Sequence, residues 1–166
     1  MSVYVIDPIT DSRWTDFIVG QPGASVFHSA GWLDALRRTY GYRPLVLTTS
    51  PPGARLANGL PLCEIKGWGG KRLVSLPFSD HCEPLADRLD DRLEMLSFLK
   101  HGVESASWKS VELRPRSNML PAENASDAFP AALRTSGVLS RSPACADGDP
   151  CNDGVMRVNP PWCRTA

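Results

Sequence analysis

The stretch from Pro44 to Leu76, PLVLTTSPPGARLANGLPLCEIKGWGGKRLVSL, decides the fold. Three segments of it, 44–49, 55–65 and 71–76, are rich in the aliphatic residues that favour strands. The PPG and KGWGG segments between them carry the proline and glycine that favour turns. Consecutive strands joined by short turns predict an antiparallel meander.

Two helices are predicted before this meander. One runs from residue 12 to 19 with Asp11 or Ser12 as its N-terminal cap, and the other runs from 30 to 39 after Ser29. Their apolar residues at helical spacing are Trp14, Phe17 and Ile18 in the first and Trp32, Leu33, Leu36 and Tyr40 in the second.

The remaining elements complete an α/β pattern. Residues 25–27 are predicted to be extended, and Gly41 stands where a helix C-terminal cap belongs. A third helix is predicted over 87–105, and short strands over 3–6 and 110–113. The face of the third helix is predicted from Leu89, Leu93, Leu96, Leu99 and Val103. The predicted fold is an α/β sandwich, a mixed sheet flanked by helices.

The composition of the chain changes near residue 116. Residues 117–166 hold three of the five cysteines and six of the fifteen prolines but little apolar periodicity. Such a segment buries too little apolar surface to offset the entropy of ordering it. We therefore predict a domain over 1–116 and a disordered tail over 117–166.

Charge and cysteine usage exclude several classes of function. The formal net charge is zero, which argues against general nucleic-acid binding. The first residues, MSVYVIDPITDSRW, lack the features of a signal peptide, and no apolar run is long enough to span a bilayer, so we expect a cytoplasmic protein with no transmembrane segment. The cysteines are odd in number and irregularly spaced, so we expect neither a disulfide framework nor a metal site.

Three phrases of the sequence resemble a known family when taken in order. They are VFHSAGWLDALRRTYGYRPLVLTTS at 26–50, LANGLPLCEIK at 56–66 and KRLVSLPFSDHCEPL at 71–85. In this order and at these spacings they resemble the N-terminal half of the FemAB-type acyltransferases, which belong to the GNAT-like superfamily. The resemblance covers roughly residues 14–115.

The resemblance implies a reaction and a larger architecture. Family members carry two GNAT-like domains and transfer an acyl or aminoacyl group to an amine, often on a cell-envelope or polysaccharide precursor. The donor is acyl-CoA or aminoacyl-tRNA, and its site lies largely in the second domain. The expected partners are therefore a small-molecule or glycan-precursor acceptor and the second domain.

The chain departs from the family pattern after ELRPR at 112–116. It carries no glycine-rich loop of the kind that holds a CoA pyrophosphate at a helix N-terminus. We interpret the chain as a truncated family member without a cofactor site of its own, inactive alone, with a tail read out of frame.

The richest polar cluster is SDHCE at 79–83, directly after a predicted strand. His81 is a candidate general base for an attacking amine, oriented or tuned by Asp80 or Glu83. Cys82 is a candidate nucleophile if His81 stabilises its thiolate. We place substrate contacts at Ser79, Cys82 and Glu83. Adjacent side chains on an extended segment point to opposite faces, so a direct dyad of Cys82 with His81 is geometrically poor. The alternative is a turn in which Asp80 bonds its own backbone and Cys82 fills space.

His28 and Trp32 complete the candidate substrate-binding residues, at the entry of the second predicted helix. For His28 the alternative is a polar residue at a helix start, and for Trp32 it is a core position. Trp68, in a glycine-rich loop, is either a contact residue or simply exposed. The basic pairs Arg37-Arg38 and Lys71-Arg72 are predicted to be solvated surface charge.

Two functions of different classes remain open. The first is an acyltransferase-type domain on the acceptor side of the reaction. The second is a non-catalytic binding module or pseudoenzyme that recruits an envelope precursor or a partner subunit.

Overall fold

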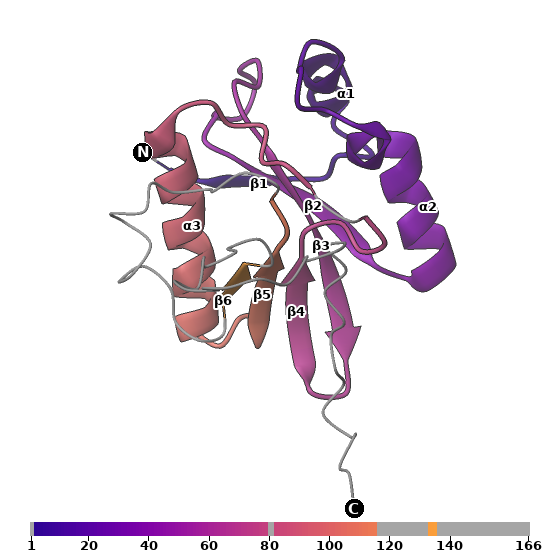
Figure 1. Ribbon diagram of the computed structural model, residues 1–166, viewed down its shortest axis with the longest axis vertical. Helices are drawn as coiled ribbons and strands as arrows, with labels where there is room; N and C mark the ends of the chain where they lie inside the picture. The colour runs from indigo at the N-terminus through magenta and orange to yellow at the C-terminus, as the bar shows by residue number, and fades with distance from the viewer. Residues whose placement is uncertain (1, 80–81, 116–132, 136–166) are drawn as a thin grey trace, which may run out of the picture.

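The computed structural model describes residues 2–79, 82–115 and 133–135. It shows an α/β protein in which one mixed sheet lies between helices (Figure 1). The helical elements are α1 (Ser12–Val19), the 3-10 helix η1 (Val26–His28), α2 (Ala30–Tyr40) and α3 (Leu89–Glu104). The strands are β1 (Tyr4–Ile6), β2 (Arg43–Thr48), β3 (Leu60–Gly67), β4 (Gly70–Val74), β5 (Ser110–Leu113) and β6 (Leu133–Thr135).

The predicted meander is confirmed. The described strands lie in the order β1-β2-β3-β4-β5-β6, and the pairs from β1 to β4 are antiparallel. The pairs β4–β5 and β5–β6 are parallel, which makes the sheet mixed. Because parallel neighbours run the same way, the carboxyl ends of β4, β5 and β6 share one edge.

The second strand of the meander is shorter than predicted. Residues 55–59 lie outside β3 because Asn58 turns its side chain back onto the end of β2. Its Oδ1 accepts from the Thr49 N–H at 3.0 Å and from Thr48 Oγ1 at 3.1 Å. The Asn58 Nδ2 donates to Thr49 Oγ1 at 2.7 Å, and that hydroxyl donates to Asp91 Oδ1 at 2.9 Å. This chain of bonds joins the first turn of α3 to the sheet.

The predicted helix caps are confirmed. Asp11 accepts from the Arg13 N–H at 3.1 Å, and Ser29 Oγ accepts from the Trp32 N–H at 3.2 Å. Gly41 ends α2 in the left-handed region, at φ +67°, where glycine carries no steric penalty.

The prediction of an extended segment at 25–27 is wrong, because η1 occupies Val26–His28. Its turn is closed by the His28 N–H, which donates to the Ser25 carbonyl at 3.0 Å. The His28 ring also accepts from the Ser25 N–H at 3.0 Å. These local bonds favour a tight turn over an extended conformation.

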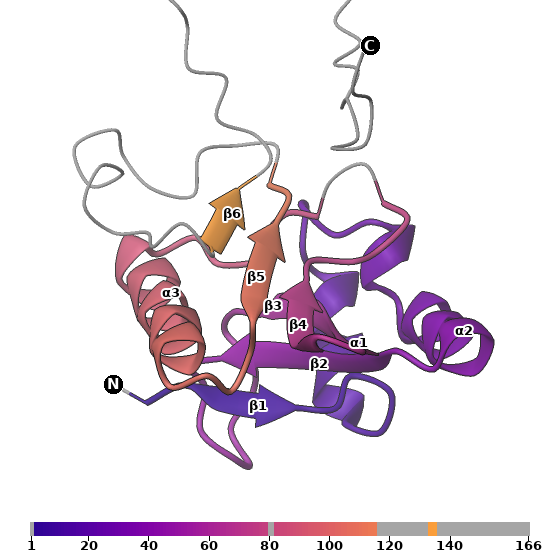
Figure 2. The same ribbon diagram turned by 90° about the horizontal axis from the view of Figure 1, so that it is seen from below.

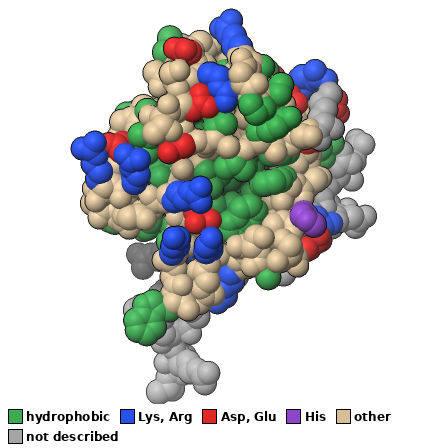
Figure 3. Space-filling view, turned by 180° about the vertical axis from the view of Figure 1, so that it is seen from behind, with side chains coloured by type: hydrophobic (Ala, Val, Ile, Leu, Met, Phe, Trp, Pro, Cys, Tyr) green, Lys and Arg blue, Asp and Glu red, His purple; other side chains and the backbone are tan. Residues whose placement is uncertain are grey.

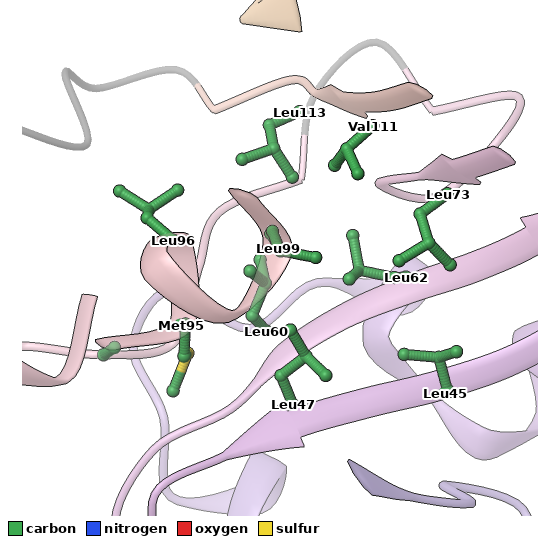
Figure 4. Packing of buried hydrophobic residues seen from close by; sticks show 11 residues of the cluster. Leu45, Leu47, Leu60, Leu62, Leu73, Met95, Leu96, Leu99, Val111 and Leu113 are labelled. Carbon is green, nitrogen blue, oxygen red and sulfur yellow. The ribbon is translucent and has the colours of Figure 1, made fainter. Parts of the chain in front are cut away.

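Helices cover both faces of the sheet (Figure 2). The helix α3 packs on one face, in a cluster with leucines of β2, β3 and β4 and with β5 (Figure 4). On the other face α1 packs around Trp14 and Phe17, and α2 packs through Leu33 and Leu36. The buried residues of the α3 cluster are Leu45, Leu47, Leu60, Leu62, Leu73, Ala86, Met95, Leu96, Leu99, Val111 and Leu113.

The predicted face of α3 is partly correct. Leu96 and Leu99 are buried as predicted, whereas Leu89 is 36% exposed. Leu89 is the first residue of the helix and lies beyond the packed turns, and Met95 fills the core instead. Tyr40, the last of the apolar residues at helical spacing in α2, is also the last residue of that helix and is 51% exposed, so it lies outside the buried face of α2.

Most of the predicted tail lies outside the described residues. Within 117–166 the structure describes β6, whose residues 133–135 pair in parallel with β5. The sheet therefore includes one strand beyond residue 116, and the domain boundary at that residue stays a prediction.

Candidate functional site

The loop predicted to hold the site lies at the shared carboxyl edge of the parallel strands. It leaves β4 at Ser75, whose N–H donates to the Glu112 carbonyl at 2.8 Å. It returns at Cys82, whose N–H donates to the Arg114 carbonyl at 2.8 Å. Ser75 Oγ accepts from the Arg114 N–H at 2.7 Å. Both ends of the loop are thus fixed to the end of β5, and ligands of open α/β sheets commonly bind at this edge.

Ser79 closes the first turn of this loop. Its Oγ donates to the Leu76 carbonyl at 2.6 Å, and its N–H approaches the same oxygen at 3.3 Å. The side chain is buried, and Arg114 Nη1 donates to the Ser79 carbonyl at 3.5 Å. The Ser79 hydroxyl, which was predicted to contact substrate, is hydrogen-bonded within the loop. The group of Ser79 that contacts another site residue is its carbonyl, which accepts from Arg114.

The loop backbone is strained at two residues that are not glycine. Leu76 has φ +39° and Phe78 has φ +66°, in the left-handed region that bulky residues rarely adopt. Strain of this kind costs about 1–3 kcal/mol per residue and is enriched at functional sites. In this backbone conformation the Phe78 side chain is 57% exposed.

Sequence reasoning missed a cluster of three aromatic rings at this loop. The Phe78 ring centroid lies 4.7 Å from that of Tyr40 and 6.4 Å from that of Tyr42, and the two tyrosines lie 5.4 Å apart. The planes of Tyr42 and Phe78 are within 11° of parallel. The signal in the sequence was the YGY phrase, in which a left-handed glycine ends α2 between two tyrosines.

His28, at the end of η1, contacts the returning end of the loop. It is 1% exposed, and its Nδ1 accepts from the Ser25 N–H at 3.0 Å. Because a backbone N–H can only donate, the ring proton is assigned to Nε2, which donates to the Glu83 carbonyl at 3.0 Å. The Cys82 Sγ lies 3.7 Å from Nε2. Three predicted site residues therefore meet, although 54 positions separate His28 from Cys82.

This arrangement makes His28 a positioning residue. Both of its ring nitrogens contact backbone groups, and its own carbonyl accepts from Trp14 Nε1 at 2.8 Å. The imidazole joins η1 to the returning end of the loop, between Cys82 and Glu83.

The environment of Cys82 opposes a nucleophilic role. The side chain is 1% exposed, and burial, with smaller contributions from Glu83 and Cys63, raises the pKa of its thiol. Burial also raises the pKa of Cys63 to about 12. Because the thiolate is the reactive species, both thiols are inert at neutral pH.

The predicted catalytic pair, Asp80 and His81, lies outside the described residues. Their neighbours Ser79 and Cys82 are both buried and hydrogen-bonded. The roles of Asp80 and His81 stay predictions.

Trp32 of α2 packs near the buried end of the loop. Its ring meets Phe27 edge to face at 5.3 Å and packs against the cluster that contains Cys82 and Leu76. Its Nε1 is buried and has no hydrogen-bond acceptor among the described residues. A buried indole N–H normally has a partner, and the described residues supply none for this donor.

An ion pair at the end of β5 is the second feature that the sequence prediction missed. Arg114 Nη2 lies 2.7 Å from Glu112 Oε1, and its Nε donates to the same oxygen at 2.8 Å. Each side chain is 31% exposed, so the pair borders the loop and meets solvent. The spacing of two along a strand places both on one face, and this was the available signal.

A shallow hollow at the far edge of the sheet has a different character. It is lined by β1 and by Asp11, Ser12 and Arg13. Arg13 pairs with Asp11 at 2.6 Å and also donates to two backbone carbonyls, and its hydrogen bond lowers the pKa of Asp11. The Asp11–Arg13 pair is thus satisfied within the fold, and Asp7, which also lines the hollow, accepts from the Ile9 N–H at 2.9 Å.

No group of three or more histidine, cysteine or acidic residues suited to a metal ion occurs in the part of the chain that the structure describes. In the same part, no helix combines the length and apolar character needed to cross a bilayer. No protein-family model matches the chain, and a search of curated proteins found no match. Fold and site define an α/β protein with a mixed sheet and a polar loop at the carboxyl edge of its parallel strands.

Proposed function

We propose that the chain is the acceptor-side domain of an N-acyltransferase of the FemAB and GNAT-like type. It binds an amine of a cell-envelope or polysaccharide precursor, which attacks the carbonyl of an acyl-CoA or aminoacyl-tRNA held outside this domain. The observation that carries the proposal is the position of the loop at 77–84. Its two ends are fixed to the carboxyl end of β5, beside Arg114 and Phe78.

The chemistry divides among the loop residues. An amine arrives as an ammonium ion, so its attack requires a base that removes one proton. In this proposal His81 is that base, and Asp80 orients it and pairs with the arriving ammonium group. Ser79, Cys82 and Glu83 give the loop its shape, and His28 holds the returning strand. The indole N–H of Trp32, which packs against Cys82 and Leu76, supports the proposal as a buried donor for which the described residues supply no acceptor.

A non-catalytic binding module is the second candidate function. It is favoured by the state of His28 and Cys82, which are buried and bonded within the fold. On this alternative the same edge binds the amine-bearing precursor without transfer.

Calorimetry with one acceptor probe tests the proposed site. The probe is a tetramer of glucosamine, which carries free amines on a polysaccharide scaffold. We expect Asp80→Asn to raise the Kd about tenfold, the worth of one charge-assisted contact, and to leave the Tm unchanged. The matched control is Asp87→Asn, an exposed acid just beyond the loop, which should change neither quantity. A lowered Tm with an unchanged Kd would identify Asp80 as a turn residue and remove the loop from the site.

Transfer separates the two functions. The full chain is incubated with the tetramer and with acetyl-CoA or aminoacyl-tRNA, in the absence and in the presence of a separate donor domain of this family, and the mass of the product is measured by mass spectrometry. N-acylation that His81→Gln abolishes, with binding retained, supports the enzyme. Binding without any transfer, also when the separate donor domain is supplied, supports the binding module.

A further inference from the structure

The β3–β4 hairpin carries a feature that the acceptor site does not use. Its two-residue tip, Trp68-Gly69, joins the paired residues Gly67 and Gly70. Gly70 adopts φ +114°, which only glycine adopts without strain, so the tip is tight and its shape is defined. Trp68 is fully exposed at 110% of its reference area, more than any other large apolar side chain described.

Nothing in the described fold holds this indole. No other ring of the described residues stacks on it, unlike the rings of Trp14, Trp32 and Trp108. Tryptophan is highly buried on average, so a fully exposed one at a tight turn among cations is a candidate contact residue.

Four cations surround the tip. Lys66 and Lys71 are directly paired across the hairpin, and Arg72 follows on the next pair. Lys109 closes the group, because a Cβ added to Gly69 would lie 2.8 Å from its Nζ. Figure 3 shows Lys and Arg side chains gathered toward the end of the molecule where this hairpin lies.

The paired lysines Lys66 and Lys71 repel each other and so lower the stability of the protein when no ligand is bound. Like charges directly opposite each other on a sheet are destabilising. The neighbouring carboxylate is Glu64, which is buried, lies 3.9 Å from Lys71 Nζ and also accepts from Trp108 Nε1 at 3.4 Å. One carboxylate leaves most of the positive charge at the tip uncompensated, and an external anion would relieve the repulsion.

We propose that the β3–β4 hairpin is a peripheral membrane anchor that binds a bilayer containing anionic phospholipid. Trp68 inserts its amphipathic ring at the level of the headgroups, where tryptophan is enriched in membrane proteins. Lys66, Lys71, Arg72 and Lys109 contact the anionic headgroups around it. The surface is convex and carries one ring, which fits a flat lipid surface, whereas single-stranded nucleic acid binds a groove with several stacking rings.

The anchor sets the distance between the membrane surface and the candidate site. The strand β4 runs from the tip to the loop at 77–84, a rise of about 15–20 Å at the spacing of extended residues. The cytoplasmic leaflet carries the anionic lipids, in agreement with the compartment that the sequence predicts. The anchor does not depend on the acyltransferase proposal, because lipid binding involves the opposite end of β4.

Co-sedimentation with vesicles tests the anchor. The full chain is mixed at low salt with vesicles of phosphatidylcholine alone or with about one third phosphatidylglycerol. We expect binding to the anionic vesicles to be at least about tenfold tighter and to weaken with added salt. Trp68→Ala should lower it about tenfold, while Trp68→Tyr retains most of it. All of these positions are exposed, so the Tm should not change.

A matched pair of charge variants isolates the hairpin. Lys66→Gln with Lys71→Gln removes two cations of the tip, which should weaken vesicle binding about fivefold for each. Arg37→Gln with Arg38→Gln removes two cations from α2, which pair with Asp34, and should leave binding unchanged. The proposal is overturned if wild-type protein ignores anionic vesicles, if both pairs lose binding equally, or if Trp68→Ala binds as wild type. Binding of a single-stranded oligonucleotide in place of vesicles, lost in the same hairpin variants, would likewise overturn it.

Discussion

His28 joins two segments that are distant in the sequence, and its replacement should be costly. His28→Ala leaves the Ser25 N–H and the Glu83 carbonyl without the imidazole partner in a buried place. Each unsatisfied group costs about 1–3 kcal/mol, so we expect the free energy of unfolding to fall by about 2–4 kcal/mol. Urea unfolding measures this change.

The matched control for His28 is His101→Ala, on the exposed side of α3. A surface change of this kind should stay within about 0.5 kcal/mol. Equal losses for the two variants would show that the bonds of His28 contribute nothing specific.

The buried thiols make stability depend on alkaline pH. Burial raises the pKa of Cys63 from 9.0 to about 12, so the thiol stays protonated in the folded protein while the unfolded chain ionises. This contribution to stability is fully present below pH 9 and is lost as the pH rises from 9 toward 12. The loss per thiol is at most about 1.4 kcal/mol for each pH unit. The raised pKa of Cys82 acts in the same direction.

Unfolding in urea between about pH 8 and 10.5 checks this sign. Relative to wild type, Cys63→Ala should show a shallower fall of the free energy of unfolding with pH, by about 1 kcal/mol per unit. Other alkaline titrations are common to both proteins and cancel in the comparison. A steeper fall in the variant would contradict the protonated, buried thiol.

At the scale of elements, two helical glycines should respond in opposite ways to the same substitution. Gly102 of α3 lies under the Trp108 ring, and a Cβ added there would overlap that ring. Gly31 of α2 has nothing within 4 Å of an added Cβ. We expect Gly102→Ala to lower the free energy of unfolding by about 1–3 kcal/mol and Gly31→Ala to raise it by about 0.5–1 kcal/mol.

The glycine comparison is made by thermal or urea unfolding of both variants. Similar effects of the two substitutions would show that the packing of Trp108 on α3 is looser than described.

Local patterns predicted most elements correctly, because caps and periodicity act over a few residues. Asp11, Ser29 and Gly41 carry their signals in their own side chains or in the lack of one, and the structure confirms all three. The predictions of secondary structure were wrong where a local hydrogen bond competes with the strand propensity of the segment. Ser25 and His28 close a 3-10 turn, and Asn58 delays the start of β3.

At the scale of the whole molecule, the mixed character of the sheet and the meander of β2, β3 and β4 could be predicted, but the neighbours of β1 and β5 could not. The parallel pairing of β5 with β4 sets Arg114 beside the loop, and nothing local to ELRPR indicates that contact. The same holds for His28 and Cys82, which meet only through tertiary packing. The sequence prediction placed the candidate site in the loop at 79–83 but missed its neighbours Arg114 and the exposed ring of Phe78.

The central claim is that the carboxyl edge of β4 and β5 binds an amine acceptor. Its most direct test is an NMR titration of the full ¹⁵N-labelled chain with the glucosamine tetramer and with its N-acetylated counterpart. The account predicts that the free-amine tetramer shifts the amides of Ser79, Cys82 and Arg114, and that the acetylated tetramer, which lacks the attacking amine, shifts them much less. Shifts centred on the hollow at Asp11 and Arg13, equal shifts with both tetramers, or no shifts at all would contradict it.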